Sequence, residues 1–333
     1  MSERRKTILS AIILIVLVPV IFIAGIVYGS EKLPVMEVIK ALFSSSDTEE
    51  IDFTAVIVKQ IRLPRILLAM CTGVLLAGAG AIFQGFFKSP LADSSMLGVS
   101  SGAALGAVIG SVLNLWMPGA AFAGSLVSIF IVYLISGGRR TSSEPVRLLL
   151  AGSAVSVFLT SVNSALILVH DKELYKMYVW TLGSFNGKGW QELSFMLVPG
   201  VISIILFVFC IKPLDVLSAG DMTSQSLGIS LKRTRLLCFA SGSLATAAAV
   251  SAGGIIGFVG LVAPHIIRMT AGSSYKKILP LSMLLGAVFL GAADILSRII
   301  APPLDIPVGI ITSLAGAPFF IFILLRYNKR YAS

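Results

Sequence analysis

The side chains best suited to binding chemistry in this sequence are three arginines at the ends of long apolar runs. Arg62 and Arg65 lie in the segment QIRLPR, and Arg298 follows Asp294 by one helical turn. An arginine fork binds a carboxylate through two parallel hydrogen bonds, so arginines beside a pore are suited to dock an acidic partner or an anionic ligand. The alternative is that they anchor helix ends or pair internally, as Asp294 and Arg298 would at i, i+4.

The sequence offers no comparable candidates for catalysis or metal binding. His170 and His265 are far apart, and no nucleophile constellation accompanies either. Cys71, Cys210 and Cys238 lie in or at the ends of apolar runs without CxxC spacing, which indicates core residues. A phosphate loop of the form G-x-x-x-x-G-K-S/T is missing, so the chain does not bind ATP by that route. We therefore expect no cofactor, no metal site and no enzymatic activity.

The elements that position the arginines are predicted to be membrane-spanning helices. The chain is 56% hydrophobic and 13% charged, with a mean hydropathy of +0.95, values outside the range of water-soluble domains. We expect an all-α, polytopic membrane protein whose residues 1–333 form one transmembrane domain. The first apolar run lacks a small-residue cleavage site and is interpreted as a retained helix. Ten candidate spans lie near residues 8–29, 64–86, 96–115, 118–136, 147–169, 193–211, 234–252, 256–268, 278–300 and 307–326.

The formal net charge of +10 is better explained by orientation in a bilayer than by nucleic-acid binding. When the N-terminal MSERRK is placed in the cytoplasm and the chain alternates sides, most of the 26 lysines and arginines lie inside, in agreement with the positive-inside rule. Both termini are then cytoplasmic. The first outer loop, about residues 30–58, is acidic by contrast.

Two glycine patterns stand out within the predicted spans. Gly98, Gly102, Gly106 and Gly110 follow each other at i, i+4 steps, so that one helical face admits close approach of another helix; packing within the subunit is the expected use. The second pattern is GGIIGFVGLVAPHIIR at 253–268, which is too short and too interrupted for an ordinary span. An interrupted span usually lines a protein-walled cavity, because lipid does not satisfy the freed backbone groups. This pattern indicates transport.

The inner segment 214–228 is polar and is predicted to face the cytoplasm. A cytoplasmic loop of this kind is a surface on which a soluble motor protein can bind and exert force. The alternative is an ordinary solvated connector.

Several ordered segments together resemble the iron-siderophore and vitamin B12 permease family of ABC importers. The resemblance covers nearly the whole chain. The matching pieces are QIRLPRILLAMCTGVLLAGAGAIFQGFFKSPLADSSMLGVSSGAALG at 60–106, RLLLAGSAVS at 147–156, WTLGSF at 180–185, GFVGLVAPHIIR at 257–268, ADILSR at 293–298 and PVGIITSLAGAPFFIFILL at 307–325.

The resemblance implies a ten-helix permease of the type II ABC importer class. It implies as partners a second permease subunit in a homo- or heterodimer, two ATP-binding subunits and an extracytoplasmic substrate-binding protein. Arg62, Arg65 and Arg298 fall on positions that dock the binding protein in this family. Segment 214–228 would form the coupling helices that seat on the ATPase, and this chain reads LSAGDMTSQSLG where a common form reads LSLGEETARSLG. The coupling residues carried over are Leu217, Ser218, Gly220, Asp221, Ser224, Leu227 and Gly228, and those of the family motif are Gly257, Gly260, Pro264, His265 and Arg268.

The function implied by the resemblance is import of a ferric siderophore across the cytoplasmic membrane of a bacterium, with a corrinoid or haem as alternatives. We expect a wide, weakly binding path lined by small or apolar residues. An ion-coupled secondary transporter is the main rival class, but no acidic residue lies near a mid-span position. A membrane enzyme acting on lipid-linked substrates would need clustered polar residues at one interface, and the sequence shows none.

Overall fold

The computed structural model describes residues 3–43, 53–137, 145–170, 174–218, 220, 224, 226 and 229–331. Within these residues all regular secondary structure is helical, which confirms the predicted fold class. The elements are α1 (Glu3–Val27), α2 (Val35–Phe43), α3 (Phe53–Val56), the π-helical η1 (Ile57–Arg62), α4 (Leu63–Phe86), the 3₁₀ turn η2 (Ser94–Leu97), α5 (Val99–Val112), α6 (Met117–Ile135), α8 (Pro145–Val169), α9 (Leu174–Thr181), α10 (Trp190–Ser218), α12 (Leu231–Gly253), α13 (Val259–Ala271), α14 (Tyr275–Ile299) and α15 (Val308–Tyr331).

Each of the ten predicted spans coincides with an apolar helix, but the helices differ in length. Among the described residues, seven helices are long and apolar enough to cross a membrane, and Val99–Val112, Val259–Ala271 and Val308–Phe322 are shorter. Helix α5 is short because the chain before it forms η2 and then takes a left-handed φ of +78° at Gly98. The predicted count of ten spans is therefore not confirmed exactly among the described residues, although the membrane class is.

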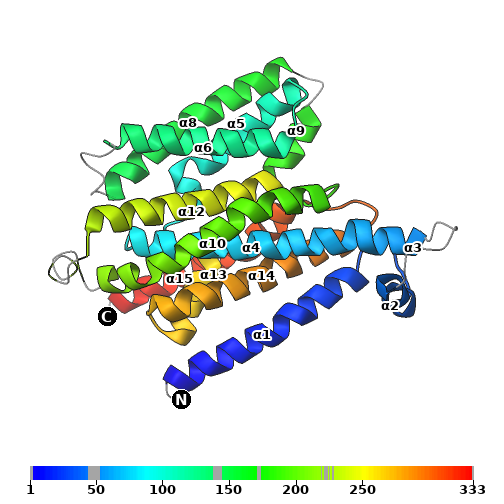
Figure 1. Cartoon of the computed structure of the whole chain (residues 1–333), viewed down its shortest axis with the longest axis horizontal. Coiled ribbons are helices and arrows are strands. Elements are labelled where there is room, and N and C mark those ends of the chain that lie inside the picture. The colour runs from blue at the N-terminus through cyan, green and yellow to red at the C-terminus, as the bar shows by residue number, and fades with distance from the viewer. Residues whose placement is uncertain are drawn as a thin grey trace.

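The helices form a layered bundle in which α4 lies near the centre (Figure 1). Helices α5, α6, α8 and α9 make a layer on one side, and α1 lies on the opposite side. The most apolar window of the continuous segment Phe53–Phe86 is 83% buried, whereas that of α1 is 17% buried. Close approach at the centre depends on glycine, because a Cβ at Gly73 or Gly80 would collide with the backbone of Gly286 or Gly260.

The glycine stripe of α5 faces α6. A Cβ at Gly102 would meet the Gly124 carbonyl oxygen at 2.5 Å, and one at Gly106 would collide with the Ala120 carbonyl. Ser128 of α6 adds a hydrogen bond of 2.7 Å to the Gly98 carbonyl. The two helices therefore meet backbone to backbone.

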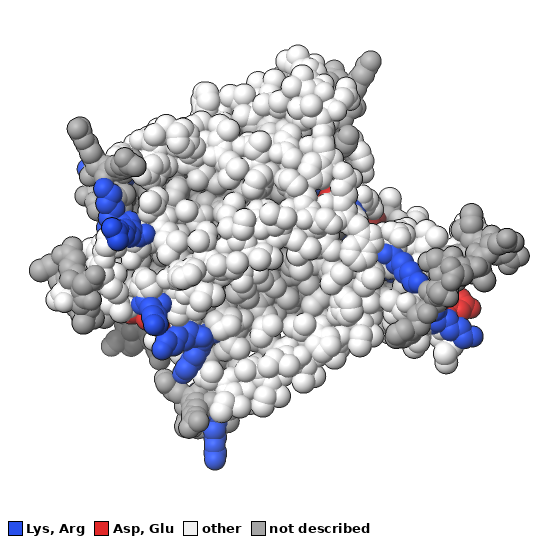
Figure 2. All heavy atoms as spheres, viewed as in Figure 1, with Lys and Arg blue, Asp and Glu red and all other residues white. Residues whose placement is uncertain are grey.

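The charged side chains gather at the two ends of the bundle, as Figure 2 shows for one face, and a broad uncharged band separates them. This distribution suits a body whose middle lies in hydrocarbon and whose ends reach the headgroups and water.

Candidate functional site

The three arginines singled out in the sequence come together at one end of the bundle, and all three are buried. The Arg65 side chain donates from Nε to Asp294 Oδ1 at 3.0 Å and from Nη1 to Asp305 Oδ2 at 2.7 Å. Asp294 is fully buried on α14, and Asp305 lies in the connection between α14 and α15. Arg65 therefore ties α4 to two segments that follow it by more than 200 residues.

Arg298 also binds the Asp294 carboxylate, and it donates a hydrogen bond to a backbone carbonyl near the end of α1. Its Nη2 lies 2.5 Å from Asp294 Oδ2, and its Nη1 donates to the Gly25 carbonyl at 3.0 Å. The i, i+4 pairing considered from the sequence is thereby confirmed. Two arginines on one buried carboxylate leave a positive excess, which the carbonyl oxygens and Asp305 offset.

Arg62 closes the same end from the π-helical turn η1. It donates to the carbonyl oxygens of Ile26 at 3.0 Å, Val27 at 2.6 Å and Glu31 at 2.5 Å. These carbonyls lie at and beyond the end of α1, where no intrahelical donor remains, so the guanidinium acts as a C-terminal cap. A cation there also interacts favourably with the helix dipole.

The internal pairing bears directly on the docking hypothesis. Arg62, Arg65 and Arg298 are 3%, 6% and 2% exposed, so an acidic residue of another protein does not reach them without displacing partners within the chain. Docking by these three side chains stays a prediction. The geometry favours a positioning role, in which the arginines fix the surface loops around them.

Lys188 is a titratable group at this end whose pKa is shifted toward neutral pH. It lies in the loop before α10, where desolvation lowers its pKa to about 7; Glu192 opposes the shift and Arg65 adds to it. The loop is held by the Gly189 N–H, which donates to Glu192 Oε2 at 2.8 Å, and by the Trp190 indole, which donates to the Lys59 carbonyl at 3.0 Å.

The family-motif residues lie between α12 and α14. The helical structure is interrupted between Gly253, where α12 ends, and Val259, where α13 begins. Within this interruption Gly254 and Phe258 have positive φ values of +79° and +67°. The Ser184 N–H donates to the Gly253 carbonyl at 2.9 Å, so part of the freed backbone is satisfied inside the protein. Ile255, within the break, lines a cavity, as expected for an interrupted span.

Gly260 and Gly257 differ in what surrounds them. Gly260 packs against α4, where a Cβ would lie 2.8 Å from the Leu76 carbonyl oxygen, and Gln84 donates to the Gly260 carbonyl at 3.4 Å. Gly257 has no heavy atom within 4 Å of a built Cβ.

The other two residues of the motif in this region lie within helix α13. Pro264 lies inside α13. His265 is 8% exposed and faces Phe319 edge-on at 6.5 Å between ring centroids.

The last residue of the motif, Arg268, contacts residues at the opposite end of the bundle from the three arginines. Its Nη2 donates to the Tyr275 hydroxyl at 2.7 Å, and its guanidinium carbon lies 5.3 Å from the centre of that ring. The Tyr275 N–H in turn donates to Asp215 Oδ1 at 2.6 Å, and Ser274 donates to Asp215 Oδ2 at 3.2 Å. Asp215 of α10 thus caps the start of α14.

The predicted coupling segment, residues 214–228, includes this capping residue. Leu217 is 1% exposed, Ser218 donates to the Asp215 carbonyl at 2.6 Å, and Gly220 has a left-handed φ of +117°. Ser224 is fully buried and donates to the carbonyls of Gly220 at 2.7 Å and Val216 at 3.1 Å, so this part of the segment folds back on α10. Asp221, Leu227 and Gly228 lie outside the described residues.

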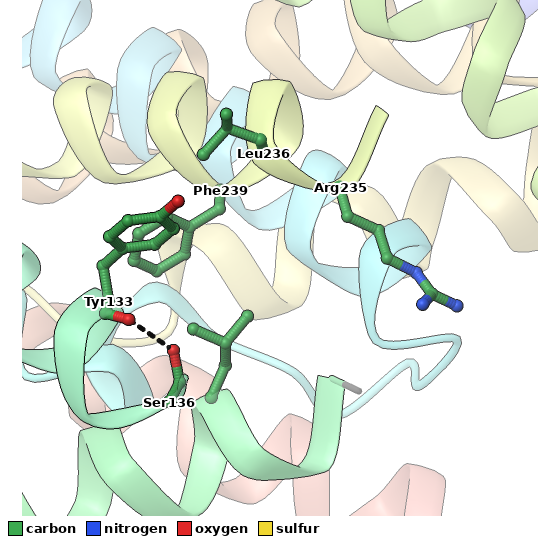
Figure 3. A pocket seen from close by; sticks show the side chains of 6 residues that line it. Tyr133, Ser136, Arg235, Leu236 and Phe239 are labelled. Atoms are coloured by element: carbon green, nitrogen blue, oxygen red, sulfur yellow. Dashed lines mark hydrogen bonds between the residues drawn. The ribbon is translucent and has the colours of Figure 1, made fainter. Parts of the chain in front are cut away.

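A small cavity lies where α6 and α12 meet near this end (Figure 3). Its volume is about 10 Å³, enough for about one water molecule. The rings of Tyr133 and Phe239 stack beside it with centroids 6.4 Å apart. It is packing space and not a ligand site.

A much larger cavity, about 540 Å³, lies between α5, α8 and α9. Ser95, Ser100, Ser101, Ser156, Thr160, Asn163, Ser164 and Thr181 contribute polar groups to its wall. The wall also includes apolar residues, among them Ala104, Ile167 and Ile255.

Sequence reasoning missed Asp215, Asp305 and the polar face of α8. Asp215 and Asp305 act on partners far along the chain, so their own neighbourhoods give no signal. The face of α8 does carry one, because Ser153, Ser156, Thr160 and Asn163 recur at steps of three and four residues in an otherwise apolar run.

Comparison with known proteins gives one consistent result. The profile of the FecCD transport family matches residues 14–326. The chain is 42% identical to the cobalamin import system permease protein BtuC of Halobacterium salinarum, over 81% of this chain and 73% of that one. It is 34% identical to the Fe(3+) dicitrate transport system permease protein FecD of Escherichia coli, over 81% and 85%. A solved structure described as an inward-facing, metal-chelate type ABC transporter superposes with a TM-score of 0.80 at 29% identity, over 94% of this chain and 99% of that chain.

The fold and these matches define a multi-pass transmembrane permease subunit of an ABC importer. The chain belongs to the FecCD transport family. It is accordingly the membrane component of its transporter and not an enzyme, since the ATPase of such an importer is a separate subunit.

Proposed function

We propose that this permease carries a metal chelate, with a ferric siderophore as the first candidate cargo. The observation that carries the proposal is the family match across residues 14–326, which extends over both charged ends and all ten apolar helices. The structural likeness to a metal-chelate type transporter supports it, and so does the likeness to an Fe(3+) dicitrate permease.

A corrinoid is the second candidate cargo. It is favoured by the 42% identity to a cobalamin permease, which is higher than the 34% identity to the dicitrate permease. Haem remains a further member of the same class of large metal chelates.

The proposed assembly contains a second permease subunit, identical or related, together with two ATP-binding subunits and an extracytoplasmic binding protein. The chain lies among the lipids of a bacterial cytoplasmic membrane with both termini inside, and nucleic acid has no part in its function. The excess of lysine and arginine on the inner segments supports this orientation. One transmembrane domain, residues 1–333, contains the coupling segment 214–228.

The binding protein docks on the end that holds Arg62, Arg65 and Arg298. The π-helical turn η1 at this end supports a functional role, because such turns are frequent at functional sites. Ion pairs between these arginines and an acidic lobe of the binding protein would replace contacts with Asp294, Asp305 and backbone carbonyls. If the internal contacts are kept instead, the arginines stabilise the loops of the docking surface, and exposed residues of that surface contact the binding protein.

ATP-driven movement enters at the opposite end, through segment 214–228. Support comes from the position of this segment between α10 and α12 and from the Asp215 cap, which connects the last turn of α10 to α14. A movement of the segment therefore reaches two long helices at once and switches the path from outward to inward access.

Uptake measurements test the cargo directly. In cells that carry this permease with its partner genes, accumulation of ⁵⁵Fe-labelled siderophores, ⁵⁷Co-labelled cyanocobalamin and haem is compared before and after deletion of the permease gene. We expect uptake of one metal chelate to be lost and to return on complementation. Uptake that persists when ATP is depleted at constant membrane potential would establish the ion-coupled class instead.

Purified permease alone, reconstituted in liposomes, is the second test. It is expected to hydrolyse no nucleotide and to accumulate none of these chelates. Accumulation by that preparation would contradict the proposed division between permease and ATPase.

A further inference from the structure

Helix α2 lies outside the long membrane-spanning helices and packs on one of its sides against the end of the bundle. It comprises Val35–Phe43 and lies beside the end of α1, on the side of the bundle away from α5, α6 and α8 (Figure 1). Val38 and Ala41 are buried and belong to an apolar cluster that includes Ile26 of α1. This packing fixes the rotation of α2 about its own axis, and it therefore decides which residues stay uncovered.

The next side of α2 is apolar and uncovered. At about 100° of rotation per residue, Val35, Met36 and Ile39 fall on one arc of the helix, adjacent to the buried arc. They are 54%, 65% and 46% exposed. Three apolar side chains that share an arc are better accommodated in an apolar environment than in water.

The third side of α2 carries charge. Glu37 and Lys40 fall beyond Met36 around the helix, and both are exposed. Glu31 and Lys32, just before the helix, are exposed as well, so the acidic and basic groups of residues 28–43 balance. A helix with one side packed on protein, one side apolar and one side charged is typical of an element at the boundary between lipid and water.

The level of α2 in the membrane follows from helix α1. Helix α1 has 25 residues, about 37 Å of helix against a hydrocarbon core of about 30 Å. Only 17% of its most apolar window is buried, so its uncovered side faces lipid. Tyr28 directly follows α1 and is 58% exposed, as are aromatic residues at the level of the headgroups. Because α2 packs against Ile26 at this same level, its apolar arc continues the lipid-facing surface of α1.

We propose that α2 is an interfacial helix whose Val35, Met36 and Ile39 insert among the phospholipids of the outer leaflet, between the headgroups and the first methylene groups. The lipid contact is made by apolar surface, while Lys40 extends toward the phosphate oxygens and Glu37 faces water. Since the local charges balance, neutral and anionic phospholipids serve equally well.

The inserted helix also supports the end of the bundle that holds the three arginines. Arg62 donates to the carbonyls of Val27 and Glu31, which lie at the end of α1 and in the connection from α1 to α2. The membrane holds this connection from one side through α2, and the Arg62 guanidinium holds it from the other.

The accessibility of nitroxide labels tests the depth of α2. The full-length permease is reconstituted in phosphatidylcholine nanodiscs, and a label is attached to the Met36→Cys variant; unsubstituted protein gives the background from its own cysteines. We expect the label to collide with oxygen more often than with a water-soluble nickel complex, at a depth of about 5–10 Å. Glu37→Cys, on the charged side, is the matched control and should collide with the nickel complex about threefold more often than Met36→Cys does.

A charge placed on the apolar arc tests insertion itself. Adding Ile39→Asp to Met36→Cys should raise collisions with the nickel complex about threefold, because a carboxylate is poorly tolerated among acyl chains. Ile39→Leu, at the same exposed position, keeps the apolar surface and should leave the collisions unchanged. Replacing about one third of the phosphatidylcholine with phosphatidylglycerol should also leave the depth of the label unchanged.

Four results would overturn the inference. Equal access of the nickel complex to the labels at Met36→Cys and Glu37→Cys would place α2 in water. An immobile label that neither oxygen nor the nickel complex reaches would show that a second copy of the chain covers the arc. Loss of oxygen collisions only on addition of the substrate-binding protein would make the arc part of its docking surface. A depth that appears only with phosphatidylglycerol would replace apolar insertion by binding of an anionic headgroup.

Discussion

Helices α4 and α8 are both apolar enough to span a membrane, yet they differ in burial and in the bonds that their polar side chains make to other helices. The window of α4 is 83% buried and that of α8 only 22%. On α4, Arg65 and the amide nitrogen of Gln84 are buried and donate to groups on other helices, although the Gln84 amide oxygen has no hydrogen-bond partner among the described residues. On α8, Asn163 is buried without a donor and Ser164 bonds only within its own helix. Helix α4 is thus the packed centre of the subunit, whereas most of α8 is not covered by the rest of the subunit.

The largest expected effect is on the backbone contacts of α4. Gly80→Val places side-chain atoms where the Gly260 backbone lies, and neither helix has room to retreat in the packed centre. We expect no folded protein in the membrane fraction, measured by size-exclusion chromatography after detergent extraction. Gly257→Ala is the matched control, since nothing lies within 4 Å of its new Cβ; normal recovery of Gly80→Val would show that α4 is not a tightly packed scaffold.

The next effect concerns the carboxylate shared by α4 and α14. Asp294→Ala leaves Arg65 and Arg298 buried without their common partner, which should lower the free energy of unfolding by about 3–5 kcal/mol. Thermal unfolding of the solubilised protein measures the loss. Glu37→Gln, at an exposed residue of α2, should change it by about 0.5 kcal/mol or less. Equal shifts for the two variants would argue that the arginine network is not structural.

Two buried amides sharpen the comparison between the helices. On α4, Gln84→Leu removes the hydrogen bonds to the carbonyls of Gly260 and Leu261, at 3.4 Å and 3.2 Å, and should destabilise the fold by about 1 kcal/mol. The same thermal assay applies. No shift would mean that α13 is held to α4 by glycine packing alone.

The smallest effect is expected for the corresponding change on α8. Asn163→Leu replaces an unpaired amide with an apolar side chain of similar size, so stability should stay within about 0.5 kcal/mol or rise slightly. Destabilisation by more than Gln84→Leu would place Asn163 in a structural role and weaken the distinction between the two helices.

The sequence predicted the helical membrane fold and the position of each apolar run, and it offered the Asp294–Arg298 pair as an alternative to docking, because these depend on local hydropathy and on i, i+4 spacing. The length of α5 was not predictable, since the left-handed Gly98 and the η2 turn follow from packing against α8. The partners of Arg65 were equally hidden, because Asp305 lies 240 residues away. Docking and coupling roles depend on other proteins, and no pattern within this chain tests them.

The hydrogen bond between Asp215 and the first residue of α14 has a mechanical consequence. Helix α14 has 25 residues, about 37 Å of continuous helix, and its far end carries Asp294 in contact with Arg65. If the coupling segment moves as proposed, a tilt of the last turn of α10 is passed through this hydrogen bond to α14, the helix that also carries Asp294.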